Sequence, residues 1–227
     1  MNTEVPRMLE GGPALWLADG PVPRLPRDVG AVVQTSGTTG TARSVVLSRA
    51  ALRAAAEAVR ERVGDLTWHL ALPGRYVAGL MVQVRSAAAG RGTPVVPADL
   101  EGLTPTGEGD AISLVPTQLH RALGDADVTK RLRAFDLILI GGAPLGQELR
   151  ERAGDAGLAV VESYGMSETC GGVVWDGTPL PGVGIGLRDG RVVIGGPTLF
   201  DGYLGDPGAT AEVVDGGMLL TRDRGRW

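Results

Sequence analysis

The sequence is poor in cysteine, in aromatic residues and in long apolar runs. Its 227 residues include one cysteine, Cys170, and only 4% phenylalanine, tryptophan and tyrosine. One cysteine excludes a disulfide within the chain and fits a reducing compartment. The N-terminus lacks the apolar stretch of a signal peptide, and no segment approaches the ~20 apolar residues that span a bilayer. These absences favour a soluble cytoplasmic protein without a membrane partner.

An excess of charge of one sign is also absent. The formal net charge of −4 gives no reason to expect nucleic acid or an anionic membrane as a partner. An apolar content of 43% with 21% charged residues is typical of a globular protein with a real core. Glycine, in contrast, is abundant at 36 residues. The glycine-rich loops are therefore the first places to look for chemistry.

The chain is predicted to have three parts. Residues 1–28 are rich in proline and glycine without clear periodicity, and we expect an irregular arm. Residues 29–171 alternate β-type and helical patterns, which is typical of a mostly parallel sheet covered by helices. Residues 172–227 carry short β-type runs between glycine, aspartate and proline. The expected fold class is α/β, followed by a small β-rich subdomain.

Apolar patterns locate the main elements. A helical face over residues 49–63 follows Ser48, a suitable N-cap, and Gly64 is suited to end that helix. Residues 76–90, 116–123 and 144–157 predict further helices. The run FDLILI, residues 135–140, is apolar apart from Asp136, as expected of a strand buried on both faces. Further strands are expected over residues 30–34, 44–47, 67–72, 93–97, 111–115 and 158–163.

The stretch TSGTTGTARS, residues 35–44, gathers glycines and hydroxyl side chains around Arg43. Backbone amides exposed in such a loop bind anions, and a cation completes a phosphate site. The loop nearly matches the P-loop pattern, but Ala42 and Arg43 replace its Gly-Lys, and a strand follows where a helix is required. We therefore reject a P-loop NTPase. Phosphate binding and an ordinary hairpin turn both stay open.

Three other segments could carry chemistry. IGGAPL, residues 140–145, follows the most buried strand, where ligands bind in open α/β sheets. ESYGMSET, residues 162–169, offers an aromatic face, a hydroxyl and Glu168, whose carboxylate suits Mg²⁺. TRDRG, residues 221–225, places Asp223 just past a strand, where it could accept both hydroxyls of a ribose. Each segment taken alone is equally compatible with an ordinary turn.

The series TSGTTG, GGAPL, YGMSET and TRD, in this order, resembles the motifs of the adenylate-forming superfamily of acyl-CoA synthetases, adenylation domains and luciferases. The resemblance runs from about residue 30 to the end of the chain. Within the superfamily, LPGRYVAGLMVQVRS and LVPTQLHRAL look most like the o-succinylbenzoate–CoA ligases of menaquinone biosynthesis. It implies the large N-terminal domain of that fold, shortened, without the C-terminal lid domain.

The resemblance implies a role for each matching position. The β- and γ-phosphates of ATP would be covered by Thr35, Ser36, Gly37, Thr38, Thr39, Gly40 and Arg43. The rest of the nucleotide would meet Gly141, Gly142, Ala143, Pro144, Ser163, Tyr164, Gly165, Met166, Ser167 and Asp223. Of these, Tyr164 would pack on the adenine, Ser167 would contact the α-phosphate and Asp223 would bind the ribose. Glu168 would hold Mg²⁺, and the aryl acid would lie near Tyr76, Gly79, Leu80, Gly165 and Met166.

The implied reaction joins an aryl acid to ATP and then to CoA. A carboxylate attacks the α-phosphate to give an acyl-adenylate and pyrophosphate, and the CoA thiol then displaces AMP. Arg43 and Glu168 are the implied catalytic residues, because positioning and charge screening supply most of the acceleration. No protein nucleophile is needed, so we expect Cys170, His69 and His120 to be structural. The partners implied are small molecules, and the oligomeric state is open, a homodimer included.

Several positions depart from the family pattern. Arg43 stands where lysine is usual, Tyr76 stands where histidine is usual, and Arg191 follows Gly190 where an acid is usual. The lead-in is short, and the domain that carries the second catalytic lysine is not in the chain, so we expect little activity from this part alone. A non-catalytic nucleotide-binding relative and a different acid-activating ligase stay open. Arg75 and Arg85 are the candidates for gripping the succinyl carboxylate.

Overall fold

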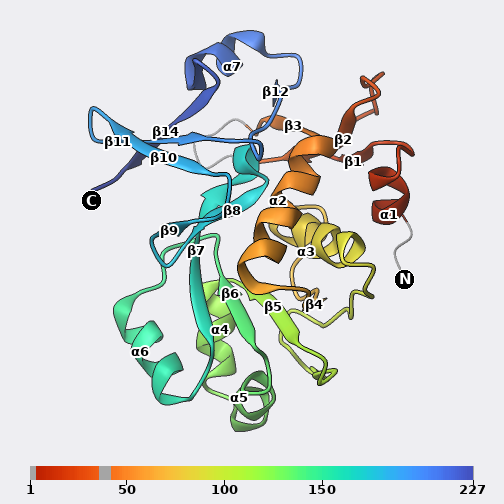
Figure 1. Cartoon of the computed structure of the whole chain (residues 1–227). Coiled ribbons are helices and arrows are strands. Elements are labelled where there is room, and N and C mark those ends of the chain that lie inside the picture. The colour runs from red at the N-terminus through yellow and green to blue at the C-terminus, as the bar shows by residue number, and fades with distance from the viewer. Residues whose placement is uncertain (1–3, 36–41, 227) are drawn as a thin grey trace.

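A six-stranded sheet forms the centre of the molecule (Figure 1). The computed structural model describes residues 4–35 and 42–226. In spatial order the strands are β4 (Thr67–His69), β5 (Asp110–Leu114), β6 (Leu137–Ile140), β7 (Val160–Met166), β8 (Gly171–Trp175) and β9 (Thr178–Pro179). Strands β4 to β7 are parallel, and β8 and β9 continue the sheet antiparallel. The expected α/β class with a largely parallel sheet is confirmed.

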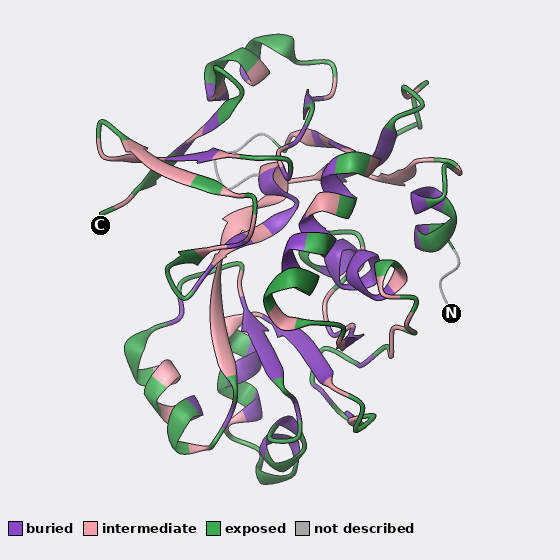
Figure 2. Ribbon diagram, viewed as in Figure 1, coloured by how far each residue is buried: buried purple, intermediate pink, exposed green. Residues whose placement is uncertain are grey.

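Helices cover both faces of this sheet, because β5 and β6 alternate apolar side chains to either side. Ala111, Leu137 and Leu139 pack with α2 (Arg49–Val63) and α3 (Val77–Ala88). Ile112, Leu114, Ile138 and Ile140 pack on the other face. There they meet α4 (Pro116–Ala122), α5 (Ala126–Leu132) and α6 (Gln147–Asp155). Figure 2 shows β5 and β6 buried along their whole length.

The predicted helix boundaries near the first loop are confirmed. The Ser48 hydroxyl accepts a hydrogen bond from the Ala51 amide, so it caps the first turn of α2. The helix ends at Val63, and Gly64 follows with a φ of +75° that would strain a residue with a side chain.

Two segments differ from the prediction. Residues 93–97, expected to be a strand, make only one isolated bridge, between Leu70 and Val95. Helix α5 was not predicted from the sequence.

The first 28 residues are more ordered than the irregular arm that the sequence analysis expects. Helix α1 (Glu4–Leu9) buries Val5, Met8 and Leu9, and β1 (Leu15–Leu17) pairs parallel with β2 (Val29–Gln34). Arg49 and Arg53 of α2 donate hydrogen bonds to the carbonyls of Met8 and Leu9 at the end of α1. A helix of six residues is too short to leave a periodic pattern, and tertiary contacts stabilise it.

Two smaller sheets complete the fold. One has the order β1, β2, β3 (Ser44–Ser48) and β12 (Gly202–Tyr203). The other is antiparallel, with the order β10 (Gly184–Arg188), β11 (Arg191–Gly195), β14 (Met218–Arg224) and β13 (Val214–Asp215). Helix α7 (Pro207–Val213) precedes β13. The expected boundary near residue 172 falls inside the central sheet, because β8 pairs with β7 across a turn.

Buried polar groups at the β4–β5 edge form a structural unit. His69 and Asp110 are 0% and 1% exposed, and the His69 Nε2 lies 2.6 Å from the Asp110 Oδ1. Asp110 also accepts hydrogen bonds from the Thr106 hydroxyl and the Gly107 amide. His69 therefore has the structural role expected.

Among the described residues, no helix is both long and apolar enough to cross a bilayer.

The pH dependence of stability tests this unit. Burial raises the pKa of Asp110, but hydrogen bonds from His69, Gly107 and Thr106 outweigh burial and hold it below its ordinary 3.8. The stabilisation is therefore complete above the unfolded-state pKa and is lost as the pH falls through the lower folded-state pKa. We expect Asp110→Asn to lower the free energy of unfolding at pH 7 by ~1–3 kcal/mol.

Urea unfolding of the wild type and Asp110→Asn at pH 7 and pH 3 measures this difference. The difference in unfolding free energy between the two proteins should narrow at pH 3, because the Asp110 carboxylate of the unfolded wild type is then protonated. An equal gap at both pH values would contradict the role of the charge. Asp155→Asn is the matched control, since Asp155 is exposed at the end of α6.

Candidate functional site

A cavity of about 780 Å³ opens where the carboxyl ends of the parallel strands meet the two smaller sheets. Ligands bind at this edge in open α/β sheets. Segments far apart in the sequence contribute to its wall. The predicted site residues that line it are Thr35, Arg43, Tyr76, Gly141, Gly142, Ser163, Gly165, Met166, Ser167, Glu168 and Asp223. The structure thus brings together residues from all four motif segments.

The threonine- and glycine-rich loop connects β2 to β3, as the sequence predicts. Thr35 and Arg43 close its base: the Thr35 amide donates to the Arg43 carbonyl at 2.9 Å, and the Arg43 amide donates to the Thr35 hydroxyl oxygen at 3.0 Å. Ser36, Gly37, Thr38, Thr39 and Gly40 lie outside the described residues. The closed base aims Arg43 at the cavity.

Glu168 lies in the 3₁₀ turn η1 (Ser167–Thr169), directly after β7. Its Oε1 accepts a hydrogen bond of 2.7 Å from the Tyr203 hydroxyl, and the Arg43 guanidinium lies 4.8 Å from the centre of the Tyr203 ring. Burial first, and then the hydrogen bond to Glu168, raise the pKa of Tyr203 to about 12 against a smaller lowering by Arg43, so its hydroxyl stays a donor. Sequence reasoning missed Tyr203, which lies in the segment FDGYLGD and lines the cavity.

Tyr164 and Asp223 join β7 to β14. The Tyr164 hydroxyl donates to the Asp223 Oδ2 at 2.8 Å. Burial first, and then the hydrogen bond to Asp223, raises the pKa of Tyr164. Tyr164 itself is not among the residues that line the cavity, whereas Ser163, Gly165 and Asp223 are. Tyr164 therefore does not line the cavity itself, and contributes to it by orienting Asp223, which does.

The glycines of the wall serve close packing of strands. A Cβ atom at Gly165 would lie 2.1 Å from the Gly171 carbonyl oxygen, and one at Gly172 would lie 1.7 Å from the Ser163 hydroxyl oxygen. A side chain at Gly165 would push β7 and β8 apart, whereas one at Gly172 would displace the Ser163 hydroxyl. Gly142 has a φ of +80°, which any L residue would strain, so it shapes the turn that follows β6.

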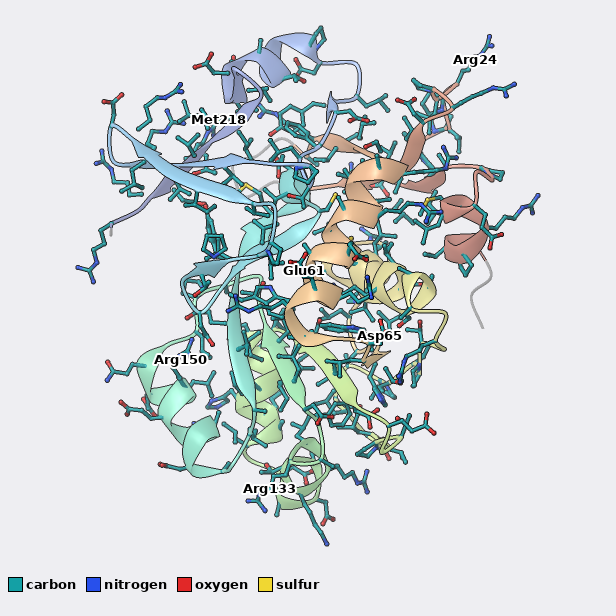
Figure 3. The ribbon with its side chains drawn as sticks, in the orientation of Figure 1. Arg24, Glu61, Asp65, Arg133, Arg150 and Met218 are labelled. Carbon is teal, nitrogen blue, oxygen red and sulfur yellow. The ribbon has the colours of Figure 1, made fainter. Side chains whose placement is uncertain are left out.

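The loop after β6 is held from the side of β7. The Leu145 amide donates to the Glu162 Oε1 at 2.9 Å. Arg150 of α6, labelled in Figure 3, bonds both Glu162 and Asp176 at 2.8 and 2.9 Å. Ala143 and Pro144 are exposed and do not line the cavity, unlike Gly141 and Gly142. Only the first half of the GGAP segment therefore faces the cavity.

Helix α3 presents a different face from the one expected. Gly79 and Leu80 are buried in the core and do not line the cavity, and a Cβ at Gly79 would lie 2.4 Å from the Pro73 carbonyl oxygen. Val77, Met81 and Arg85, spaced four residues apart, line it together with Ala78. Successive helix positions point about 100° apart, so neighbours in a motif do not share a surface. The four-residue spacing of Val77, Met81 and Arg85 is the sequence signal that could have identified this face of the helix.

Arg85 is a buried cation that has no acidic partner among the described residues. It is 7% exposed, its guanidinium stacks 4.6 Å from the centre of the Trp68 ring, and burial lowers its pKa to about 10. Its Nε has no hydrogen-bond partner among the residues that the structure describes. Arg75, the other candidate, is exposed, stacks on Tyr76 and does not line the cavity.

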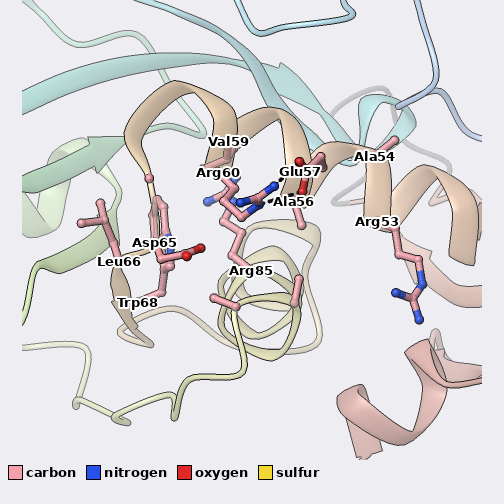
Figure 4. Close-up of a pocket in the computed structure, with 13 residues that line it drawn as sticks. Arg53, Ala54, Ala56, Glu57, Val59, Arg60, Asp65, Leu66, Trp68 and Arg85 are labelled. Atoms are coloured by element: carbon pink, nitrogen blue, oxygen red, sulfur yellow. Dashed lines mark hydrogen bonds and ion pairs between the residues drawn. The ribbon is translucent and has the colours of Figure 1, made fainter.

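A second cavity, of about 370 Å³, lies between α2 and α3 (Figure 4). Arg85 lines both cavities, beside Trp68 on this side. The other cations here have partners, since Arg60 bonds Glu57 and Arg53 bonds the Leu9 carbonyl. No other predicted site residue lines this second cavity. Arg85 therefore forms part of the wall between the two cavities.

The donor set suits a magnesium ion shared with phosphates. Within the described residues there is no group of three or more side chains that could hold a metal by themselves. Mg²⁺ is usually bound by one or two carboxylates and substrate phosphates, and Glu168 offers one carboxylate on the wall beside Arg43.

Cys170 is buried directly after the turn that carries Glu168, and burial raises the pKa of its thiol.

Comparisons with known proteins agree with this geometry. The chain is 42% identical over 213 residues to the probable 2-succinylbenzoate–CoA ligase of Mycobacterium tuberculosis, a match that covers 87% of this chain and 54% of that protein. It thus spans about half the length of this relative. Bacillus subtilis o-succinylbenzoate CoA synthetase in complex with its acyl-adenylate intermediate has a TM-score of 0.77 at 25% identity. This match covers 85% of this chain and 58% of that one.

The same B. subtilis enzyme in complex with ATP and magnesium ion has a TM-score of 0.76 at 25% identity, over 85% of this chain and 46% of that one. The family model described as AMP-binding enzyme matches residues 5–204. This range contains the hairpin loop, the turn after β6 and Glu168. The chain therefore belongs to the AMP-binding enzyme family.

Proposed function

We propose that this chain forms the ATP- and acyl-binding part of an o-succinylbenzoate–CoA ligase, the cytoplasmic acid-activating enzyme of menaquinone biosynthesis. One observation carries the proposal: a single cavity is lined by Arg43 and Glu168, by Asp223 and by the buried Arg85, which has no acidic partner among the described residues. These groups match, in turn, a polyphosphate with its cation, a ribose and a carboxylate. The relatives named above act on the same acid.

ATP would be held by groups on four segments. Arg43 and Thr35 at the base of the hairpin loop would meet the β- and γ-phosphates, and Ser167 the α-phosphate. Asp223, oriented by the Tyr164 hydroxyl, would accept the ribose hydroxyls. The turn at Gly141 and Gly142 would face the adenine. Bound Mg²⁺, with Glu168 as its protein ligand, would screen the phosphate charges.

The acyl side of the cavity would bind an aryl acid that carries two carboxylates. Val77, Met81 and Tyr76 supply apolar and aromatic surface, with Gly165 and Met166 on the opposite strand. One carboxylate of o-succinylbenzoate is activated, and the other stays charged in a partly buried place. Arg85 would pair with this second carboxylate, since a buried cation without a partner gains most from an anion.

The residues would promote the two steps by placing charge. The acid carboxylate attacks the α-phosphorus while the bond to pyrophosphate breaks, so two anions must be brought together. Arg43 lowers their repulsion, and the cavity wall holds the reacting atoms in contact. The CoA thiol then attacks the acyl carbon and AMP leaves. Cys170 takes no part, because it is buried and does not line the cavity.

Thermal unfolding tests the nucleotide site. A ligand present at ~100 times its dissociation constant stabilises the folded state by ~2.7 kcal/mol. For a domain of this size, Mg·ATP should therefore raise the melting temperature by roughly 5–10 °C. In Glu168→Gln the dependence on Mg²⁺ should weaken, while the shift with metal-free AMP should stay as in the wild type. No shift of the wild type with Mg·ATP or AMP would refute the nucleotide site.

Binding of two acids tests Arg85. Arg85→Met should weaken binding of o-succinylbenzoate by ~10- to 100-fold, because a charge-assisted hydrogen bond is lost. Benzoate lacks the second carboxylate, so its weaker binding should not change. The unliganded variant should be as stable as the wild type or more stable, since it no longer buries an unpaired charge.

Calorimetric titration with both acids, in the presence of AMP, measures these affinities. Arg75→Met is the matched control, because Arg75 is exposed and does not line the cavity. Equal affinity of Arg85→Met and wild type for o-succinylbenzoate would rule out the assigned role. A stronger response to benzoate than to o-succinylbenzoate in the wild type would refute the substrate itself.

A further inference from the structure

We propose that Tyr203 is a positioning residue that holds Glu168 and Arg43 apart and in place, so that both charges remain free for Mg·ATP. The inference rests on the proposed function and adds to it a residue that the motif comparison did not assign. Tyr203 makes one contact with each of the two residues on which the phosphate site depends. Other contacts, to β3 and to α7, fix its backbone.

The chain around Tyr203 is bonded to both motif segments. Its strand β12 pairs antiparallel with β3, with Tyr203 opposite Val45. The amides of Asp201 and Leu204 donate to the carbonyls of Val46 and Ser44 at 2.9 and 2.8 Å. The Phe200 amide donates to the main-chain carbonyl of Glu168 at 2.8 Å. Residues 200–204 therefore link the strand that follows Arg43 to the turn that carries Glu168.

Helix α7 fixes this link from its other side. The Tyr203 amide donates to the Thr210 hydroxyl oxygen at 2.9 Å, and the Thr210 hydroxyl donates to the Asp206 carbonyl at 2.9 Å. Gly202 has a φ of +133°, and a Cβ there would lie 3.0 Å from the Thr210 methyl carbon. This position favours glycine, because the backbone conformation would strain a side chain and the Thr210 methyl leaves little room for one. The Tyr203 backbone is thus anchored before any ligand arrives.

The side chain of Tyr203 uses its two ends differently. Its hydroxyl donates to the Glu168 carboxylate at 2.7 Å, while its ring face lies 4.8 Å from the Arg43 guanidinium. The Phe200 ring packs edge-on against the Tyr203 ring at 5.1 Å and limits its rotation. In the part of the chain described, no ion pair joins Arg43 to Glu168.

The physical consequence is that Tyr203 keeps opposite charges from neutralising each other. A direct Arg43–Glu168 pair would occupy the carboxylate that the cation needs and the guanidinium that the phosphates need. The hydroxyl satisfies the carboxylate without removing its charge, and the ring satisfies the guanidinium without an anion. Groups that orient a metal ligand in this way typically change metal affinity by ~10- to 100-fold when removed.

Two substitutions separate the hydroxyl from the ring. Tyr203→Phe keeps the ring beneath Arg43 and removes only the hydroxyl. We expect it to raise the Mg²⁺ concentration for half-maximal stabilisation by ATP by ~10-fold or more, with AMP binding unchanged. Tyr203→Leu removes both contacts and should also weaken metal-free ATP relative to AMP by ~3-fold or more.

Thermal unfolding of the full chain, titrated with Mg²⁺ at fixed ATP and with AMP alone, measures these effects. Thr198→Val is the matched control, since it removes a nearby buried hydroxyl that has no partner among the described residues. AMP binding reports that each variant is folded. In a Glu168→Gln background, Tyr203→Phe should change the Mg²⁺ requirement by less than about twofold, because both act through one ligand.

The outcomes distinguish this inference from the proposed function. A wild type that binds neither Mg·ATP nor AMP refutes the proposed function and the role of Tyr203 with it. A wild type that binds Mg·ATP, with Tyr203→Phe and Thr198→Val alike in Mg²⁺ requirement, overturns the role of Tyr203 alone. A selective rise for Tyr203→Phe that disappears in the Glu168→Gln background supports it.

Discussion

The burial of β5 and β6 on both faces is the constraint on which the rest of the structure depends. Every residue of these strands is buried, so their backbone groups must be paired within a sheet and their side chains must meet apolar helices on either side. Parallel pairing then directs all their carboxyl ends to one edge. The turn at Gly141, the β7–η1 junction and the wall of α3 meet there as a consequence, and the cavity is the space that they leave.

The charged groups around this cavity are arranged so that several remain available. Asp110, far from it, has a full set of hydrogen-bond donors and contributes only to the fold. Within the described part of the chain, Arg85 is buried at the cavity without an acid, and Arg43 and Glu168 each contact Tyr203 rather than one another. A stable fold normally pairs its buried charges. Incomplete pairing is therefore concentrated at the cavity, where a ligand can complete it.

Sequence reasoning located the elements better than the contacts. The run FDLILI and the cap at Ser48 were interpreted correctly, because continuous apolarity and capping are local properties. Helix α1 and Tyr203 were missed, because the former is held by arginines of α2 and the latter by α7 and β3. Gly79 and Leu80 were assigned to the substrate, but they face the core, since a motif records order along the chain and not direction around a helix.

The sequence by itself determined the α/β class, the family and the segments that carry chemistry, because periodicity, turn chemistry and motif order are written in neighbouring residues. Only the tertiary structure decided which side chains of those segments face the cavity. It paired Tyr164 with Asp223, placed Tyr203 between Arg43 and Glu168, and left Arg85 stacked on Trp68 without an acid among the described residues. These contacts join strands and helices that are distant in the chain, so sheet pairing, hydrogen bonds and packing between those elements set the distances.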